Sequence, residues 1–180
     1  MSVFSNPAGE AANATAQYVK ALLDVAGDGD PLPRMTTAPD RVAEAIRGLS
    51  ATQLQTPERE GKWCIAEVLG HLADTDLVAG FRFRMALAHD TPDIPGYDQD
   101  LWCKRLQYKD IPAEDSLAQL RILRDANMKM FARLPIESRQ RVGIHSERGH
   151  ETVEHMIRLI AGHDVVHLRQ IERIRSVVTS

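Results

Sequence analysis

The 180-residue sequence has few cysteines and few aromatic residues, and it lacks long hydrophobic runs. Its two cysteines, Cys64 and Cys103, lie far apart without a CxxC spacing, which excludes a disulfide scaffold and a four-cysteine zinc site. No stretch approaches the ~18 apolar residues of a membrane span, and the N-terminus has no basic segment followed by an apolar one. We therefore expect a cytoplasmic protein that does not enter a membrane.

The sequence also lacks a strong charge of either sign. The formal net charge at pH 7 is -3, and the basic residues are dispersed along the chain. Nucleic-acid-binding proteins usually concentrate lysine and arginine in a patch or stripe, so we expect no direct binding of nucleic acid. With 43% hydrophobic and 26% charged residues, the chain has the composition of one globular domain with a sizeable core.

Helical spacing of apolar residues dominates, and no stretch alternates apolar and polar residues for long enough to predict a convincing strand. The pattern predicts an all-α fold: a four-helix bundle with one long crossover connection, plus an extra N-terminal helix. Within a single domain, we assign residues 1–36 to the N-terminal helix and linker and residues 37–180 to the bundle. The predicted helices cover residues 11–26, 37–52, 64–89, 114–134 and 151–177, with a short helix at 97–105 in the crossover.

Two histidines lie four residues apart in the last predicted helix, His163 and His167. At 100° per residue they are separated by about 40° around the helix axis, on its apolar face. Two imidazoles one turn apart can bind a single metal ion at ~2.0–2.1 Å. Such pairs also arise by chance, so the pair alone leaves both a metal site and ordinary core histidines open.

A third histidine, His71, lies on the inward face of the helix predicted at 64–89. Three inward histidines would each need a polar partner in an apolar interior, whereas one divalent ion would bind all three. Three protein ligands leave further coordination positions for water or substrate, as in catalytic sites, and the natural reaction is hydrolysis by a metal-bound water. Three imidazoles suit zinc, nickel, iron and copper alike.

Several motifs together resemble the YfiT-like metal-dependent hydrolases of the DinB superfamily. They are the stretch "GKWCIAEVLGHLADTD", a Thr-Pro and Tyr-Asp crossover, and the terminal "GHDVVHLRQI", and the resemblance covers about residues 40–174. It implies a four-helix bundle, often dimeric, that holds nickel, zinc or another divalent ion through His71, His163 and His167. We therefore expect a homodimer acting on a small molecule, with nickel or zinc ahead of iron or copper.

Two other functions remain open at this point. Relatives in the same superfamily resemble thiol-dependent transferases and isomerases, in which the metal activates the thiol of a low-molecular-weight cofactor. A non-enzymatic role is the other alternative, as a metal-stabilised bundle in a stress response. Nothing in the sequence decides between these functions and hydrolysis.

Two carboxylates share the face of His71 within about 60°, Glu67 and Asp74. Hydrolysis needs a general base or a group that orients the metal-bound water, and Glu67 is our candidate for this role. For Asp74 we expect a hydrogen bond to an imidazole, because metal-binding histidines nearly always have such a partner. For both residues the alternative is a solvated carboxylate at the helix surface.

Three further polar residues lie near the histidines. Gln170, one turn beyond His167, can hydrogen bond a ligand or the bound water, and Asn127 is a buried amide that needs a partner. Asp164 follows His163 as glutamate does in HExxH proteases, but its side chain is one methylene shorter. We expect Asp164 at the surface or beside the ligands, without a catalytic role.

Two more residues reach the site only under a condition. His145 precedes the last helix and approaches the metal only if its loop folds over the site. Arg82 lies on the face of His71 but about 16 Å further along the helix, so it can bind only a distant carboxylate of a long substrate.

Overall fold

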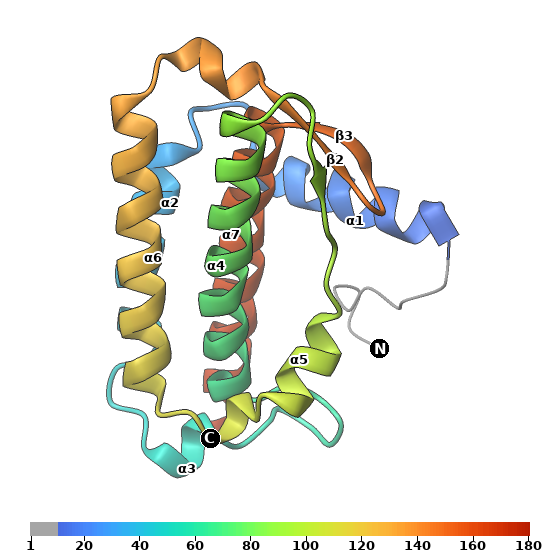
Figure 1. Ribbon diagram of the computed structural model, residues 1–180. Helices are drawn as coiled ribbons and strands as arrows, with labels where there is room; N and C mark the ends of the chain where they lie inside the picture. Colours follow the sequence, from blue (N-terminus) through green and yellow to red (C-terminus); the bar gives the residue numbers. More distant parts are fainter. Residues whose placement is uncertain (1–10) are drawn as a thin grey trace.

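The computed structural model describes residues 11–180, with side chains from residue 16 onward (Figure 1). Short 3-10 helices cover Tyr108–Asp110 and Ile136–Gln140. The α-helices of the described chain are α1 (Ala11–Ala26), α2 (Leu32–Ile46), α3 (Ala51–Leu54), α4 (Ile65–Ala88), α5 (Gln99–Arg105), α6 (Ala113–Arg133) and α7 (Val153–Val178).

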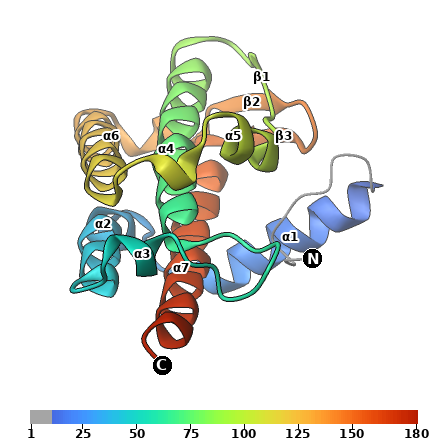
Figure 2. The same cartoon turned by 90° about the horizontal axis from the view of Figure 1, so that it is seen from below.

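Helices α2, α4, α6 and α7 form the bundle. Each packs against two others: α2 against α6 and α7, and α4 against the same two (Figure 2). Helices α4 and α6 run in the same direction, so the chain returns along the bundle between them (Figure 1). This return, which contains α5, is the predicted long crossover, and the predicted four-helix bundle is confirmed.

A small three-stranded sheet beside the bundle was not predicted from the sequence. Strand β1 (Asp93–Ile94) pairs in parallel with β2 (Val142–His145), and β2 pairs antiparallel with β3 (Gly149–Thr152). Strands of two to four residues are too short to show an alternating pattern, which explains why the sequence analysis missed them. The sheet joins the crossover to the segment that precedes α7.

The predicted helix at 37–52 is wrong in its bounds. Helix α2 begins at Leu32, because Pro31 and Pro33 occupy the helix start, where a missing N–H is tolerated. It ends at Ile46, before Gly48, whose φ of 78° breaks the helix. Helix α3 then begins separately after Ser50, whose side chain forms a capping box with Gln53.

Two apolar clusters fill the bundle, one toward each end. Between them α4, α6 and α7 contribute a layer of buried polar side chains. The cluster nearer α3 includes Val42, Ile65, Leu69, Leu72, Leu120, Ile171 and Ile174. The cluster nearer the sheet includes Met35, Phe83, Ile94, Phe131, Met156 and Ile157. The polar layer contains His71, Asp76, Arg124, Asn127, His163, Asp164 and His167.

Helix α1 packs on the outside of the bundle against α7. The contact is close because Gly162 has no side chain: a Cβ there would overlap with the backbone oxygen of Leu22. Leu22 of α1 packs against Leu159 and Val166, which lie on the same face of α7 as Gly162. Helix α1 therefore crosses α7 beside His163.

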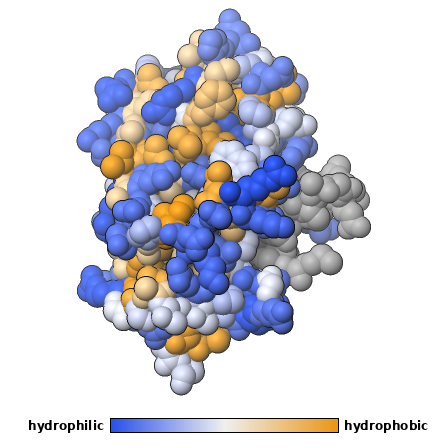
Figure 3. Space-filling model, turned by 60° about the horizontal axis from the view of Figure 1, so that its bottom comes forward, coloured by the Kyte–Doolittle hydropathy of each residue, from blue (hydrophilic) through white to orange (hydrophobic). Residues whose placement is uncertain are grey.

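The face shown in Figure 3 is mostly hydrophilic, with apolar side chains between the polar ones. The large apolar residues that remain exposed include Leu77, Phe81 and Ile122. None of the described helices combines the length and the hydropathy that a membrane crossing requires.

We predict that Gly162→Ala lowers the free energy of unfolding by about 1–3 kcal/mol, because the added methyl group meets backbone rather than a movable side chain. Urea denaturation measures the change. Gly29→Ala is the control, since a Cβ at Gly29 meets nothing within 4 Å. Equal stability of the two variants would contradict the close docking of α1.

Candidate metal centre

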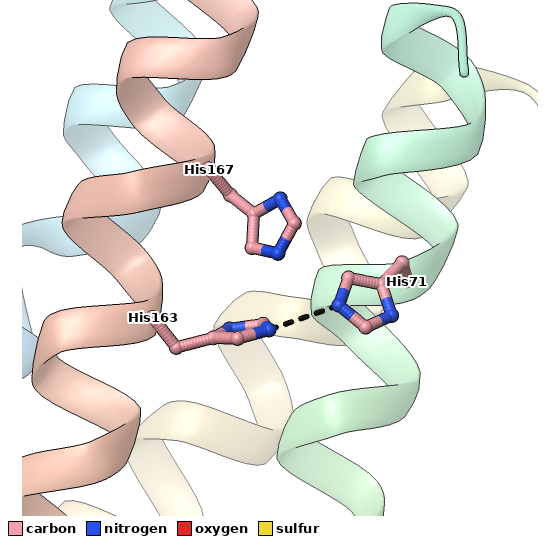
Figure 4. A group of neighbouring side chains, drawn as sticks. All are labelled: His71, His163 and His167. Carbon is pink, nitrogen blue, oxygen red and sulfur yellow. Dashed lines mark hydrogen bonds between the residues drawn. The ribbon is translucent and has the colours of Figure 1, made fainter. Parts of the chain in front are cut away.

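Three histidine side chains converge in the polar layer of the bundle. His71 comes from α4, and His163 and His167 come from successive turns of α7 (Figure 4). The Nε2 atoms of His71 and His163 lie 2.9 Å apart, and one candidate ligand atom from each of the three residues lies within 4.8 Å of the others. All three side chains are buried, with at most 6% exposed. This is the grouping predicted from the helical spacing.

The protein environment keeps these histidines neutral. Burial lowers the pKa of His71 and His167 well below the ordinary value, and neighbouring histidines of the cluster lower it further. Burial and the charge of Arg124 lower the pKa of His163 to about 3. A neutral imidazole has a free lone pair on one nitrogen, which is the form that binds a metal ion.

One hydrogen bond defines which ring nitrogen of His167 carries the hydrogen. His167 Nδ1 lies 2.8 Å from Gln170 Oε1, and an amide oxygen only accepts, so Nδ1 donates and Nε2 keeps its lone pair. This is the contact that the sequence analysis considered for Gln170. The Nδ1 atoms of His71 and His163, by contrast, are buried without a hydrogen-bond partner among the described residues.

The residues present fit a divalent metal ion. The 2.9 Å contact between His71 and His163 needs a proton on one Nε2 atom, and a metal ion that binds both nitrogens takes the place of that proton. Three neutral imidazoles suit zinc, nickel, iron and copper. One ion would bind one nitrogen of each ring, and all three rings are buried away from water.

A buried ion network that was not predicted from the sequence lies next to the histidines. Arg124 of α6 donates to both oxygens of Asp76 on α4 at 2.6 and 2.9 Å. It donates to both oxygens of Asp164 on α7 at 2.7 and 3.0 Å, and to the backbone oxygen of Met35 on α2 at 2.7 Å. Asp164 is thus buried in an ion pair: of the two positions expected for it, the surface is wrong, and it lies directly after His163 in the polar layer.

Asn127 belongs to the interface of α4 and α6. Its Oδ1 accepts a hydrogen bond from Arg84 at 2.9 Å, and its Nδ2 lies 3.5 Å from the backbone oxygen of Asp76. The amide is buried, as predicted from the stripe on α6. Its partners are the Arg84 side chain and the backbone oxygen of Asp76, and Asn127 forms no hydrogen bond to the three histidines.

Glu67 and Asp74 have partners other than those expected. Glu67 caps the start of α4 through the backbone N–H of Cys64 at 2.8 Å and accepts from Cys103 Sγ at 3.6 Å. Asp74 accepts from the Tyr108 hydroxyl at 2.5 Å and from Gln119 at 3.2 Å. Asp74 therefore does not accept the expected hydrogen bond from an imidazole. The role of base stays a prediction for both residues, and these contacts favour a structural role.

A cavity of about 160 Å³ opens beside the cluster. His71 and His163 line it from the bundle, and neither Glu67 nor Asp74 does so. Thr75 and Arg82 of α4 also line it. Helix α1, the crossover and strand β2 with the turn after it form its other walls, through Tyr18, Leu22, Tyr97, His145 and Arg148, among others. The segment before α7 thus does place His145 at the cavity that two of the three histidines line.

Comparisons with known proteins agree with this architecture. The DinB superfamily model matches residues 34–171. Proteins of Oceanobacillus iheyensis and Bacillus cereus (strain B4264), both named "Putative metal-dependent hydrolase", are 27% identical over 141 residues and 30% identical over 137 residues. These alignments cover 78% and 76% of this chain, and 81% and 79% of the relatives.

A solved structure has the same fold. YfiT from Bacillus subtilis, described as "a probable metal-dependent hydrolase with an unusual four-helix bundle topology", matches with a TM-score of 0.74 at 22% identity. The match covers 96% of this chain and 92% of that one. Fold and site together define a four-helix bundle with a buried three-histidine cluster that can hold a metal ion. The chain belongs to the DinB superfamily.

We predict that Arg124→Met lowers the free energy of unfolding by about 3–5 kcal/mol, because it leaves two carboxylates buried without a cation. Urea denaturation is the measurement. Arg121→Met on the same helix is the control, because the exposed pair of Arg121 and Asp40 contributes at most about 1 kcal/mol. A similar loss in both variants would show that the buried network has no special role.

We also predict that the metal-free protein loses stability as the pH falls from 6.5 to about 3. The unfolded chain binds protons at its histidines near pH 6.5, whereas folded His163 stays neutral down to about pH 3. The stabilising contribution is complete above pH 6.5 and declines below it. Urea denaturation over this range, compared with His163→Leu, should show a shallower decline in the variant. Identical pH profiles would contradict a neutral buried His163.

Proposed function

We propose that this protein is a metal-dependent hydrolase in which His71, His163 and His167 bind one divalent ion. The observation that supports the proposal most directly is the convergence of these three buried, neutral side chains beside a cavity that two of them line. The names of the relatives from Oceanobacillus iheyensis and Bacillus cereus support the same reaction class.

A bound divalent ion supplies a water of lowered pKa and polarises the bond to be hydrolysed. The three imidazoles hold the ion, and Gln170 keeps the lone pair of His167 Nε2 available. The apolar clusters on either side of the polar layer keep bulk water away from the ligands. Sites for drug-sized ligands measure ~300–1,000 Å³. The cavity here, at about 160 Å³, is smaller and therefore suits a molecule below that size.

The metal and the assembly remain predictions. Nickel or zinc are the first candidates and iron or copper the next, since three imidazoles accept each of them. A homodimer is expected from the family resemblance, and light scattering of the purified protein would test it.

The first test is metal stoichiometry. We expect one divalent ion per chain by equilibrium dialysis and elemental analysis. Loss of a residue that hydrogen bonds to a metal ligand usually weakens metal binding about 10–100-fold, which is the effect we expect for Gln170→Leu. Alanine at His71, His163 or His167 removes a ligand itself and should weaken binding more than about 100-fold. Trp63 provides a fluorescence readout, because its ring lies 5.1 Å from that of His71. His89→Ala, at an exposed position, is the matched control.

The second part of the test is turnover. Hydrolysis of a panel of small esters and amides should require the ion and should disappear in the three alanine variants. Failure to bind an ion at a one-to-one ratio would reject the metal site. A bound ion without hydrolysis, together with tight binding of a low-molecular-weight thiol, would replace the hydrolase by a thiol-dependent transferase.

A further inference from the structure

The cavity has a second polar region, formed by residues that belong to neither the histidine cluster nor the ion network. Arg82 comes from α4, His145 from β2 and Arg148 from the β2–β3 turn. Arg82 lies eleven residues after His71, about 16 Å along the helix. The small sheet builds this region, because Ile94 of β1 pairs with His145, and Pro95 next to it holds Arg82.

His145 offers a hydrogen-bond donor that nothing in the described chain accepts. Its Nδ1 accepts from the backbone N–H of Glu147 at 3.1 Å, so in the neutral ring Nε2 carries the hydrogen. Burial and the charges of Arg148 and Arg82 lower the pKa of His145 to about 4, so the ring is neutral near pH 7. The side chain is 2% exposed, and Nε2 is buried without a partner. Folded proteins rarely leave such a donor unpaired, which points to a ligand oxygen.

Arg82 adds a positive charge at the same wall. Its Nε and Nη2 atoms donate to the backbone oxygen of Pro95 at 3.1 and 2.6 Å, and its guanidinium lies 5.9 Å from the centre of the Tyr97 ring. These contacts fix the side chain without neutralising its charge. The described residues form no ion pair with Arg82: Glu147 and Glu151 act on it electrostatically, but Glu151 pairs with Arg148 instead. An anion beside it would balance the charge.

The other charged groups of this region have partners. Arg148 forms a two-point ion pair with Glu151, at 2.6 and 2.9 Å. Asp98 caps α5 through the backbone N–H of Leu101. Glu147 also lines the cavity and interacts with other groups, but its side chain is exposed. Arg82 is therefore the cation of this wall that is left for a ligand.

We propose that Arg82 and His145 form a subsite for an anionic group, a carboxylate or a phosphate, on the small molecule whose reacting bond lies at the histidine cluster. The proposal rests on the proposed hydrolase function for the role of that molecule. The guanidinium supplies the charge, and His145 Nε2–H supplies a directed hydrogen bond to one oxygen. The subsite selects and orients the substrate, and the histidines hold the ion.

The test titrates inorganic phosphate and, separately, acetate into metal-free and metal-loaded protein by calorimetry, which distinguishes the two anion chemistries. We expect saturable binding of at least one anion to both forms. Arg82→Met and His145→Phe should each weaken it at least about tenfold, the usual effect of losing a charge-assisted hydrogen bond. Arg82→Lys should retain part of the affinity. Arg169→Met, at an exposed position of α7, is the control and should bind normally.

Metal stoichiometry measured on the same variants separates this proposal from the proposed function. Arg82→Met should still bind one ion, and His163→Ala should lose the ion but keep the anion. Anion binding that occurs only in the metal-loaded protein and disappears in His163→Ala would place the anion on the ion and overturn the subsite. Equal affinity of Arg82→Met and Arg169→Met would overturn it as well. Anion binding without any metal binding would reject the hydrolase and leave the subsite standing.

Discussion

A single buried guanidinium connects the four helices of the bundle. Arg124 on α6 contacts Asp76 on α4, Asp164 on α7 and the backbone oxygen of Met35 on α2. Burying these charges is costly, and the hydrogen bonds that offset the cost form only when all four helices lie in one register. Apolar contacts alone tolerate a shift of one helix along another more easily than these directed hydrogen bonds do. Because Asp164 follows His163 directly, the same register sets the distance between the histidines of α4 and α7.

Helical periodicity predicted those features that depend only on the face of a helix on which a residue lies. The bundle, the long crossover and the grouping of His71, His163 and His167 follow from a repeat of 3.6 residues and the inward stripes it defines. The contact between His167 and Gln170 follows from the same geometry, because residues three apart lie on one face. These features depend on local structure, which a single sequence specifies well.

Features that depend on contacts between distant segments were missed. Arg124 lies on the inward stripe of α6 with Leu120 and Phe131, but arginine is so often exposed that the stripe alone did not indicate a buried ion pair. The pairing of β1 with β2 joins segments about fifty residues apart, which leaves no local pattern. Asp74 lies on the face predicted for it, but Tyr108, from the crossover, takes the carboxylate that was expected to bind an imidazole.

Helix α1 contributes to the shape of the cavity but not to the histidine cluster. Tyr18 and Leu22 form part of the cavity wall, and Gly162 lets their helix lie against α7, but none of the three clustered histidines comes from α1. The superfamily match begins at residue 34, after this helix ends. The first helix therefore shapes the cavity from outside the matched region, whereas all three clustered histidines lie within that region.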